Sequence, residues 1–269
     1  MILRVLGWLP RVAVLTLIAL VVFGPLTSLL LWAAAETWYF PHKLPVTYGL
    51  RYWHEVFKPT GNSMESMWNS LVVAVSTVLL CLAVSIPAGY ALARRNLPLR
   101  MLIMFAFLLP QAFPAVPVFI NIARIFYGYG LNGTILGVVL VHTTHGLVFS
   151  VWIATAAFAA VDRELEEAAR NIGASALRAF LTVTLPLAAP GIMASAIFVF
   201  LESLDEFTGT FFVGVPDVTT LPLLLFVASM EGNYQIASIT ALILLVPSVG
   251  FMLFIERFLK ADVLARVGT

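Results

Sequence analysis

The chain has 269 residues, of which 61% are hydrophobic and only 11% are charged, and its mean hydropathy is +0.99. Soluble globular domains carry roughly 25% charged residues, so this composition excludes a protein whose surface lies mostly in water. The net charge of +1 gives no indication of nucleic-acid binding, and the single cysteine, Cys81, excludes an internal disulfide.

The first apolar stretch runs from Val12 to Ala34 and follows Arg4 and Arg11. Its small residues at the end resemble a signal-peptidase site, but a signal-peptide core has about 7–15 residues. A stretch of 23 residues crosses a hydrocarbon core of roughly 30 Å as a helix. We therefore interpret it as the first membrane helix.

Five further apolar stretches follow, and lipid forces each of them to be helical because its backbone must satisfy its own hydrogen bonds. The sequence therefore predicts an all-α, polytopic membrane protein of about six transmembrane helices, forming a single domain over residues 1–269. Prolines inside the spans predict kinks. The predicted spans are Met67–Ala93, Met101–Ile122, Thr134–Ala160, Pro190–Val213 and Asn233–Phe258.

The distribution of basic residues predicts the orientation of these spans. With the N-terminus inside, eleven Lys and Arg residues fall in cytoplasmic segments and four in outer segments. Both termini are then cytoplasmic, and the segment from about Ala35 to Ser66 is an outer loop.

The longest cytoplasmic segment between spans covers residues 161–186. Asp162 is a candidate N-cap, acidic residues fill the following turn, and Gly173 is a candidate helix end. A second helical piece is expected to start at Ala174 or Ser175 and to stop before Pro186. The segment is predicted to be a compact pair of short helices, either lying on the lipid surface or docking on a partner.

The order of residues in this loop resembles the EAA signature of binding-protein-dependent ABC import permeases of the type I fold. The matching residues are Glu167, Ala168, Ala169, Gly173, Val183, Leu185 and Pro186. That family usually has Ile where Val183 stands. Further similarity lies in Asn69-Ser70 and in Tyr90-Ala91-Leu92-Ala93-Arg94, so that the resemblance covers a core of about residues 65–260.

The resemblance implies an importer that uses alternating access, with no chemistry on this chain. Its expected partners are a second permease subunit that forms a hetero-pair with this chain, two ATPase subunits and an external substrate-binding protein. In that family the loop helix docks on the ATPase subunit. By resemblance, the coupling residues here are Glu167, Ala168, Ala169, Gly173, Leu185 and Pro186.

The chain contains no phosphate-binding loop of the form Gly-x-x-x-x-Gly-Lys-[Ser/Thr]. We therefore expect ATP and Mg²⁺ to bind the partner ATPase subunits, with no cofactor or metal on this chain. The segment from Gly128 to Gly133 matches the dinucleotide pattern G-x-G-x-x-G, but it follows a membrane span instead of a strand, so we interpret the match as accidental.

Polar residues inside the spans are candidates for the translocation pathway. His142 and His145 share a helix face, where they line the pore, pack or hydrogen-bond between helices, or begin a metal site, although no carboxylate or cysteine lies beside them. Gln111 and Asn121 leave the same ambiguity between pore lining and packing. Glu202, Asp205 and Glu206 interrupt the fifth span, with Glu202 about 16 Å from the inner surface. Buried acids in lipid face a partner or a water-filled path. They either line a path for a cationic solute, cap a broken helix or bond to neighbouring subunits, or contact the binding protein.

The segment from Ser203 to Phe207, followed by Thr220-Leu221-Pro222, resembles the spermidine/putrescine branch of the family, whereas maltose-type sugar permeases more often have Trp-Asn-Glu here. We therefore expect a polyamine-like solute, with a sugar as the alternative. Two rival functions are a membrane-embedded enzyme that uses the acids and histidines, and a passive channel. The resemblance places the protein in a bacterial inner membrane.

Overall fold

The computed structural model describes residues 9–58 and 62–267, and in α13 it describes side chains only to residue 250 and at residue 253. The predicted cytoplasmic N-terminus with Arg4 lies outside the described residues, as do the side chains of Arg257, Lys260 and Arg266. The first elements are α2 (Leu9–Ala34), β1 (Ala35–Thr37), β2 (Thr47–Tyr48), α3 (Arg51–Val56), α4 (Asn62–Arg94), α5 (Arg100–Ala112) and α6 (Ala115–Gly128). They are followed by α7 (Ile135–Ala159), α8 (Arg163–Asn171), α9 (Ala176–Ala179), the π-helix η1 (Phe180–Thr184), α10 (Leu185–Asp205), α11 (Thr208–Val213), α12 (Leu221–Met230) and α13 (Tyr234–Val267).

The all-α prediction is confirmed, with one two-stranded antiparallel sheet, β1–β2, in the described part of the chain. Four helices there are long and apolar enough to cross a membrane, and a fifth is added if α5 and α6 count as one bent span. The sequence predicted six spans, whereas four or five meet this criterion in the described part of the chain. The apolar part of α13, Tyr234–Gly250, is a shorter helical segment by the same measure.

The predicted third span is broken, because α5 and α6 meet at an angle of 97°. Phe113 and Pro114 separate them. Proline clashes with the helical conformation of the preceding residue, and Phe113 accordingly adopts extended angles of φ −107° and ψ 149°. The sequence predicted a kink within one helix; the structure has two helices.

The predicted fifth span also differs from the structure at both ends. Its helix ends at Asp205, and residues 208–213 form the separate helix α11. At the other end, the helical piece expected to stop before Pro186 continues through it, and Ala176–Asp205 is one apolar stretch. The π-helix η1 precedes Pro186, and the amide of Leu185 bonds the carbonyl of Phe180, five residues back. This wider turn accommodates a proline that lacks an amide hydrogen.

The chain divides into two compact units. The smaller contains residues 1–64 and 224–245. Its core consists of Ala33, Val56 and Ile239, with Trp53 packed at the side and donating its indole N–H to the carbonyl of Ala33 at 2.8 Å. The single-domain prediction stays a prediction.

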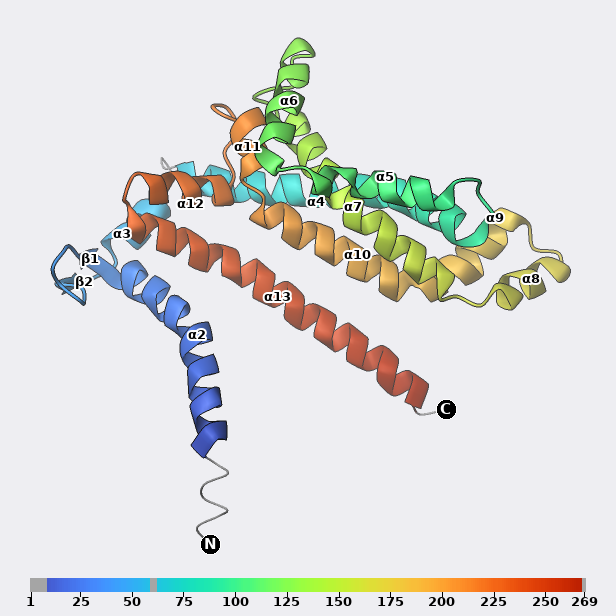
Figure 1. Cartoon of the computed structure of the whole chain (residues 1–269), viewed down its shortest axis with the longest axis horizontal. Coiled ribbons are helices and arrows are strands. Elements are labelled where there is room, and N and C mark those ends of the chain that lie inside the picture. The colour runs from blue at the N-terminus through green and yellow to red at the C-terminus, as the bar shows by residue number, and fades with distance from the viewer. Residues whose placement is uncertain (1–8, 59–61, 268–269) are drawn as a thin grey trace, which may run out of the picture. The chain divides into compact units, whose positions relative to one another are not determined.

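The larger unit, residues 65–223 and 246–269, is organised around α7. The apolar residues of this helix are spread around its whole circumference, as expected of a helix buried among others. Thr134 caps its start by accepting the amide hydrogen of Gly137 at 3.0 Å. It packs along α10 and also contacts α5, α6 and α11 (Figure 1).

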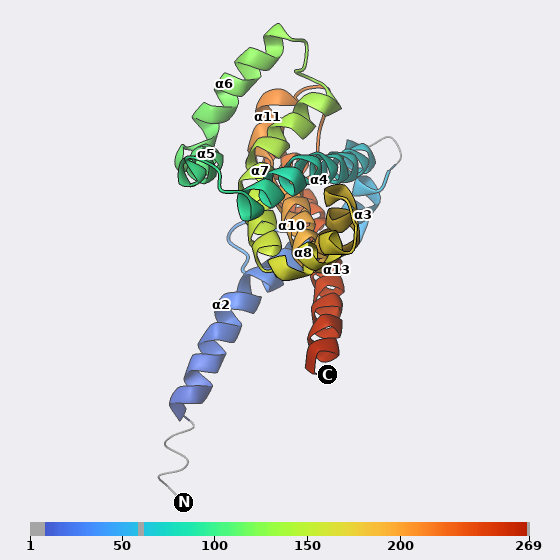
Figure 2. The same cartoon turned by 90° about the vertical axis from the view of Figure 1, so that its right-hand side faces the viewer.

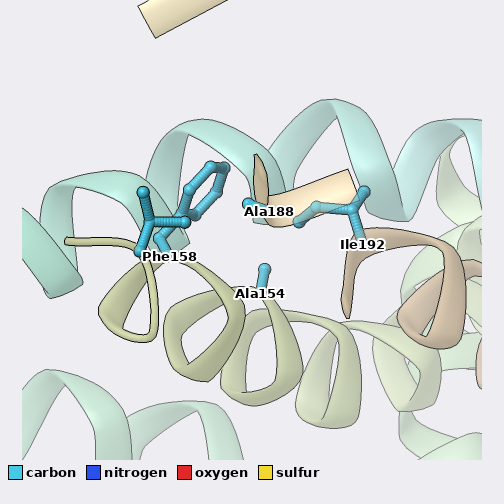
Figure 3. Close-up of a cluster of buried hydrophobic side chains, with 5 residues drawn as sticks. Ala154, Phe158, Ala188 and Ile192 are labelled. Atoms are coloured by element: carbon cyan, nitrogen blue, oxygen red, sulfur yellow. The ribbon is translucent and has the colours of Figure 1, made fainter. Parts of the chain in front are cut away.

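The end of this unit that bears α8 has an apolar core between α7 and α10. Ala154 and Phe158 of α7 face Ala188 and Ile192 of α10 (Figure 3). The helix α4 also approaches α7 closely here, because a Cβ built on Gly89 would lie 2.8 Å from the Cβ of Ala154. Small residues at such crossings are typical of helix packing in membranes.

Candidate functional site

The segment 161–186 folds as predicted up to Gly173. The carboxylate of Asp162 accepts the amide hydrogen of Glu164 at 3.0 Å and caps α8, whose first turn also carries acidic residues. Negative charge at this position stabilises α8, because the N-terminal end of a helix dipole is positive. Gly173 follows α8 with a φ of +98°, a conformation that costs glycine little. Ser175 then caps α9 by accepting the amide hydrogen of Arg178 at 3.3 Å.

The helix α8 lies beyond the ends of α7 and α4 and faces the viewer in Figure 2. Glu167 and Ala168 are exposed, and Ala169 is half-buried. Large apolar side chains are exposed beside them, with Ile172 at 89% and Leu165 at 49% of full exposure. Exposed apolar groups next to alanine make this face suited to close contact with another protein.

Glu166, a residue that the sequence analysis did not select, anchors α8 to the rest of the larger unit. One carboxylate oxygen accepts the hydroxyl hydrogen of Tyr90 at 2.5 Å, and the other accepts that of Thr184 at 3.0 Å. The anchor therefore joins α8 to α4 and to η1. Glu166 lies one position before the signature residue Glu167, and no local pattern marks it, because its partners are 76 and 18 residues away.

Two arginines reinforce this anchor. Arg94, at the end of α4, forms an ion pair with Glu166 at 3.6 Å and donates to the carbonyl of Val161 at 2.9 Å. Arg163 donates to the carbonyl of Ala93 at 2.9 Å. These bonds join the segment from Tyr90 to Arg94 to Val161 and to Arg163, on either side of the N-cap of α8. The same segment carried part of the family resemblance.

The remaining signature residues lie where the loop rejoins the membrane helix. Val183 is half-buried in η1, and Leu185 and Pro186 begin α10. The elements α9, η1 and α10 form one continuous helical stretch, Ala176–Asp205, so the loop runs into α10 without a break.

Two other sequence segments are brought together at the opposite end of α4. The amide of Asn69 donates to the carbonyl of Thr219 at 3.1 Å, and the hydroxyl of Ser70 accepts the amide hydrogen of Leu221 at 2.8 Å. These contacts join residues about 150 positions apart and fix the start of α12.

The three acids of the fifth span have different surroundings. Glu206 follows the end of α10 and accepts the amide hydrogen of Gly209 at 2.7 Å, which caps the short helix α11. Glu202 is half-buried against α7, near Gly146, and forms no hydrogen bond or ion pair with the described residues. Asp205 is exposed. Capping thus accounts for Glu206, while the carboxylates of Glu202 and Asp205 form no hydrogen bond or ion pair with the residues that the structure describes.

The two histidines also differ. His142 is buried, and its ring bonds the hydroxyl of Ser203 through Nδ1 at 2.8 Å and that of Thr210 through Nε2 at 2.9 Å. Neither ring nitrogen remains for a solute, so hydrogen bonding between helices explains His142. His145 is buried beside Phe119, with ring centroids 4.9 Å apart, and its Nδ1 has no partner among the described residues.

The other candidate polar residues lie on the broken third span. Gln111 and Asn121 are exposed, and the Asn121 amide donates to the carbonyl of Pro117 at 2.8 Å. Within residues 9–58 and 62–267, no three His, Cys, Asp or Glu side chains are grouped to hold a metal ion.

Comparison with known families gives a match over residues 85–261 to the binding-protein-dependent transport system inner membrane component. The chain belongs to this family. It is therefore a multi-pass membrane permease subunit of an ABC importer, a family of transport proteins. The matched region includes the Tyr90–Glu166 contact, the signature loop and the fifth span.

Individual permeases are similar to this chain over most of their length. The osmoprotective compounds uptake permease protein GgtD of Synechocystis is 29% identical over 84% of this chain and 77% of its own length. The trehalose transport system permease protein SugB of Mycobacterium tuberculosis is 28% identical over 73% of this chain and 74% of its own length.

Solved structures share the fold. A bacterial ABC transporter involved in the import of the acidic polysaccharide alginate matches with a TM-score of 0.70 and 17% identity, covering 95% of this chain and 96% of the matched chain. This match confirms the type I permease fold that the signature residues predicted.

Proposed function

We propose that this permease couples ATP hydrolysis to solute import through α8. The observation that carries the proposal is the Glu166 anchor, which bonds α8 to α4 and η1 while Glu167, Ala168 and Ile172 stay exposed. A helix held on one side and open on the other suits the transmission of movement from a docked partner to α10. The partners in this proposal are two ATPase subunits that bind ATP and Mg²⁺, a second permease subunit and an external binding protein.

The test replaces one small residue on the exposed face. Ala168→Trp is expected to prevent ATPase docking by bulk, while the membrane helices still insert, because Ala168 is exposed on a loop helix outside the spans. Ala168→Ser is the matched control, and it should retain both docking and transport. Co-purification of ATPase subunits and ATP-driven uptake into proteoliposomes are measured together. Normal docking and uptake in Ala168→Trp would refute the role of this face.

We propose a small polar organic solute, and the similarity to trehalose and osmoprotectant permeases supports a sugar or a related polar compound first. Glu202 and Asp205 support a second candidate, a polyamine-like cation, because two free carboxylates lie close together in a membrane helix.

The double variant Glu202→Gln/Asp205→Asn separates these candidates. For a cationic solute its uptake should fall strongly with assembly intact, because the attraction to positive charge is lost. For a neutral sugar, uptake should change little. Glu231→Gln, at an exposed position outside the spans, is the control. Competition by trehalose or by spermidine in the same proteoliposomes identifies the solute class directly.

A further inference from the structure

A cavity of about 350 Å³ lies between the end of α4 and α8. Its charged lining consists of Arg94, Arg95, Arg163, Arg170, Glu166 and Glu167. Four guanidinium groups and two carboxylates leave a formal charge of +2, from 4 − 2. Glu166 and Glu167 also take part in the coupling function proposed above, which assigns no ligand to the cavity itself.

The carboxylate of Glu166 is already occupied by Tyr90, Thr184 and Arg94. Among the described residues around the cavity, the Arg94–Glu166 contact is the sole ion pair. Arg95 and Arg170 are exposed and form no ion pair with them. The positive charge at the cavity is therefore left uncompensated by the residues that surround it.

Arg94 provides a second and independent observation. Its side chain is only 8% exposed, yet of its five N–H groups one forms a hydrogen bond within the described part of the chain, to the carbonyl of Val161. Its buried Nε faces Oε2 of Glu166 at 3.6 Å and forms no hydrogen bond within the described part of the chain. A buried guanidinium with spare donors is stabilised by an added acceptor, and phosphate oxygens match its planar fork.

We propose that this cavity binds a phosphate group, held by Arg94 with Arg95 and Arg170. The cavity lies at the end of the candidate membrane-crossing helix Asn62–Arg94, and clusters of arginine next to such helices attract anionic lipid headgroups. The phosphate comes either from an anionic phospholipid or from free inorganic phosphate. Because Arg94 also pairs with Glu166, a bound phosphate links α4 and α8 at the point where α8 is anchored.

The experiment uses the full chain in its transporter complex, in nanodiscs of phosphatidylcholine with or without phosphatidylglycerol. Native mass spectrometry measures retained phosphatidylglycerol, and inorganic phosphate is titrated against thermal unfolding in the phosphatidylcholine discs. The test variant is Arg95→Gln/Arg170→Gln, which leaves the buried Arg94 intact. The matched control is Arg178→Gln, since Arg178 is an exposed arginine of the same loop outside the cavity lining.

The double variant should bind the anion about 30-fold more weakly, because each arginine near an anionic surface contributes roughly fivefold. Arg178→Gln should bind as the unmodified chain does. Selective retention of phosphatidylglycerol identifies a lipid source, and stabilisation by phosphate in neutral discs identifies the free ion. Equal binding by the double variant and the unmodified chain overturns the proposal. The proposal is also overturned if the unmodified chain binds neither anion. Loss of the ATPase subunits by the double variant, without a change in anion binding, would show instead that the arginines hold an acidic side chain of the partner.

Discussion

The hydroxyl of Tyr90 donates a 2.5 Å hydrogen bond to the carboxylate of Glu166, joining the last turns of a membrane helix to a loop helix 76 residues further along the chain. Through Thr184, the same carboxylate reaches the helical stretch that continues into α10. One side chain therefore connects the loop to two membrane-crossing helices.

Removing this hydrogen bond should weaken the anchoring of α8. Tyr90→Phe is expected to cost about 1.5–3 kcal/mol, the range for a hydrogen bond to a charged group. Uptake per ATP hydrolysed should fall while the ATPase subunits remain bound. Tyr127→Phe is the control, because Tyr127 is 80% exposed on α6. Combining Tyr90→Phe with Glu166→Gln should give less than the sum of the two single effects; strict additivity would show that the pair is not coupled.

Gly173 allows a test in which only backbone conformation changes. A Cβ at Gly173 or at Gly128 would meet no atom within 4 Å, but only Gly173 has a positive φ, of +98°. Gly173→Ala should therefore strain the turn after α8 by about 1–2 kcal/mol, and coupled uptake should decrease. Gly128→Ala should have no comparable effect. Similar uptake by the two variants would show that the left-handed turn is not needed for transport.

Glu206 and Glu202 should respond differently to neutralisation, although they lie four positions apart. Glu206→Ala removes the cap of α11 and should lower stability by about 0.5–2 kcal/mol. Glu202→Gln removes no hydrogen bond to the described residues and should leave stability unchanged. Thermal unfolding of the purified complex measures both. Destabilisation by Glu202→Gln of the same size as by Glu206→Ala would contradict this distinction.

The orientation of the chain can be tested by cysteine labelling, because the single native cysteine, Cys81, is fully buried. A cysteine introduced by Lys43→Cys should react with an impermeant thiol reagent in intact cells. One introduced by Ser175→Cys should react only after permeabilisation. Both positions are exposed, so accessibility within the chain does not favour either. The opposite labelling pattern would reverse the predicted topology.

The sequence was sufficient for features that depend on neighbouring residues. The cap at Asp162, the end of α8 near Gly173 and the apolar stretches of α2, α4 and α7 follow from local spacing and composition. Prolines marked the irregular spans, but composition does not distinguish a kink from the 97° break after α5. Glu166 and His142 depend on partners 18 to 76 positions away, and a single sequence does not reveal such pairs.

The ring of His142 holds Ser203 of α10 with one nitrogen and Thr210 of α11 with the other, on either side of the break between these helices. The three positions are therefore expected to change together in evolution, because losing any member leaves a buried polar group without its partner. In an alignment of close relatives, an apolar residue at position 142 should be accompanied by residues without hydroxyl groups at positions 203 and 210. Permeases that exchange only one of the three should be rare, and a histidine grafted into a relative should be tolerated only together with both hydroxyls.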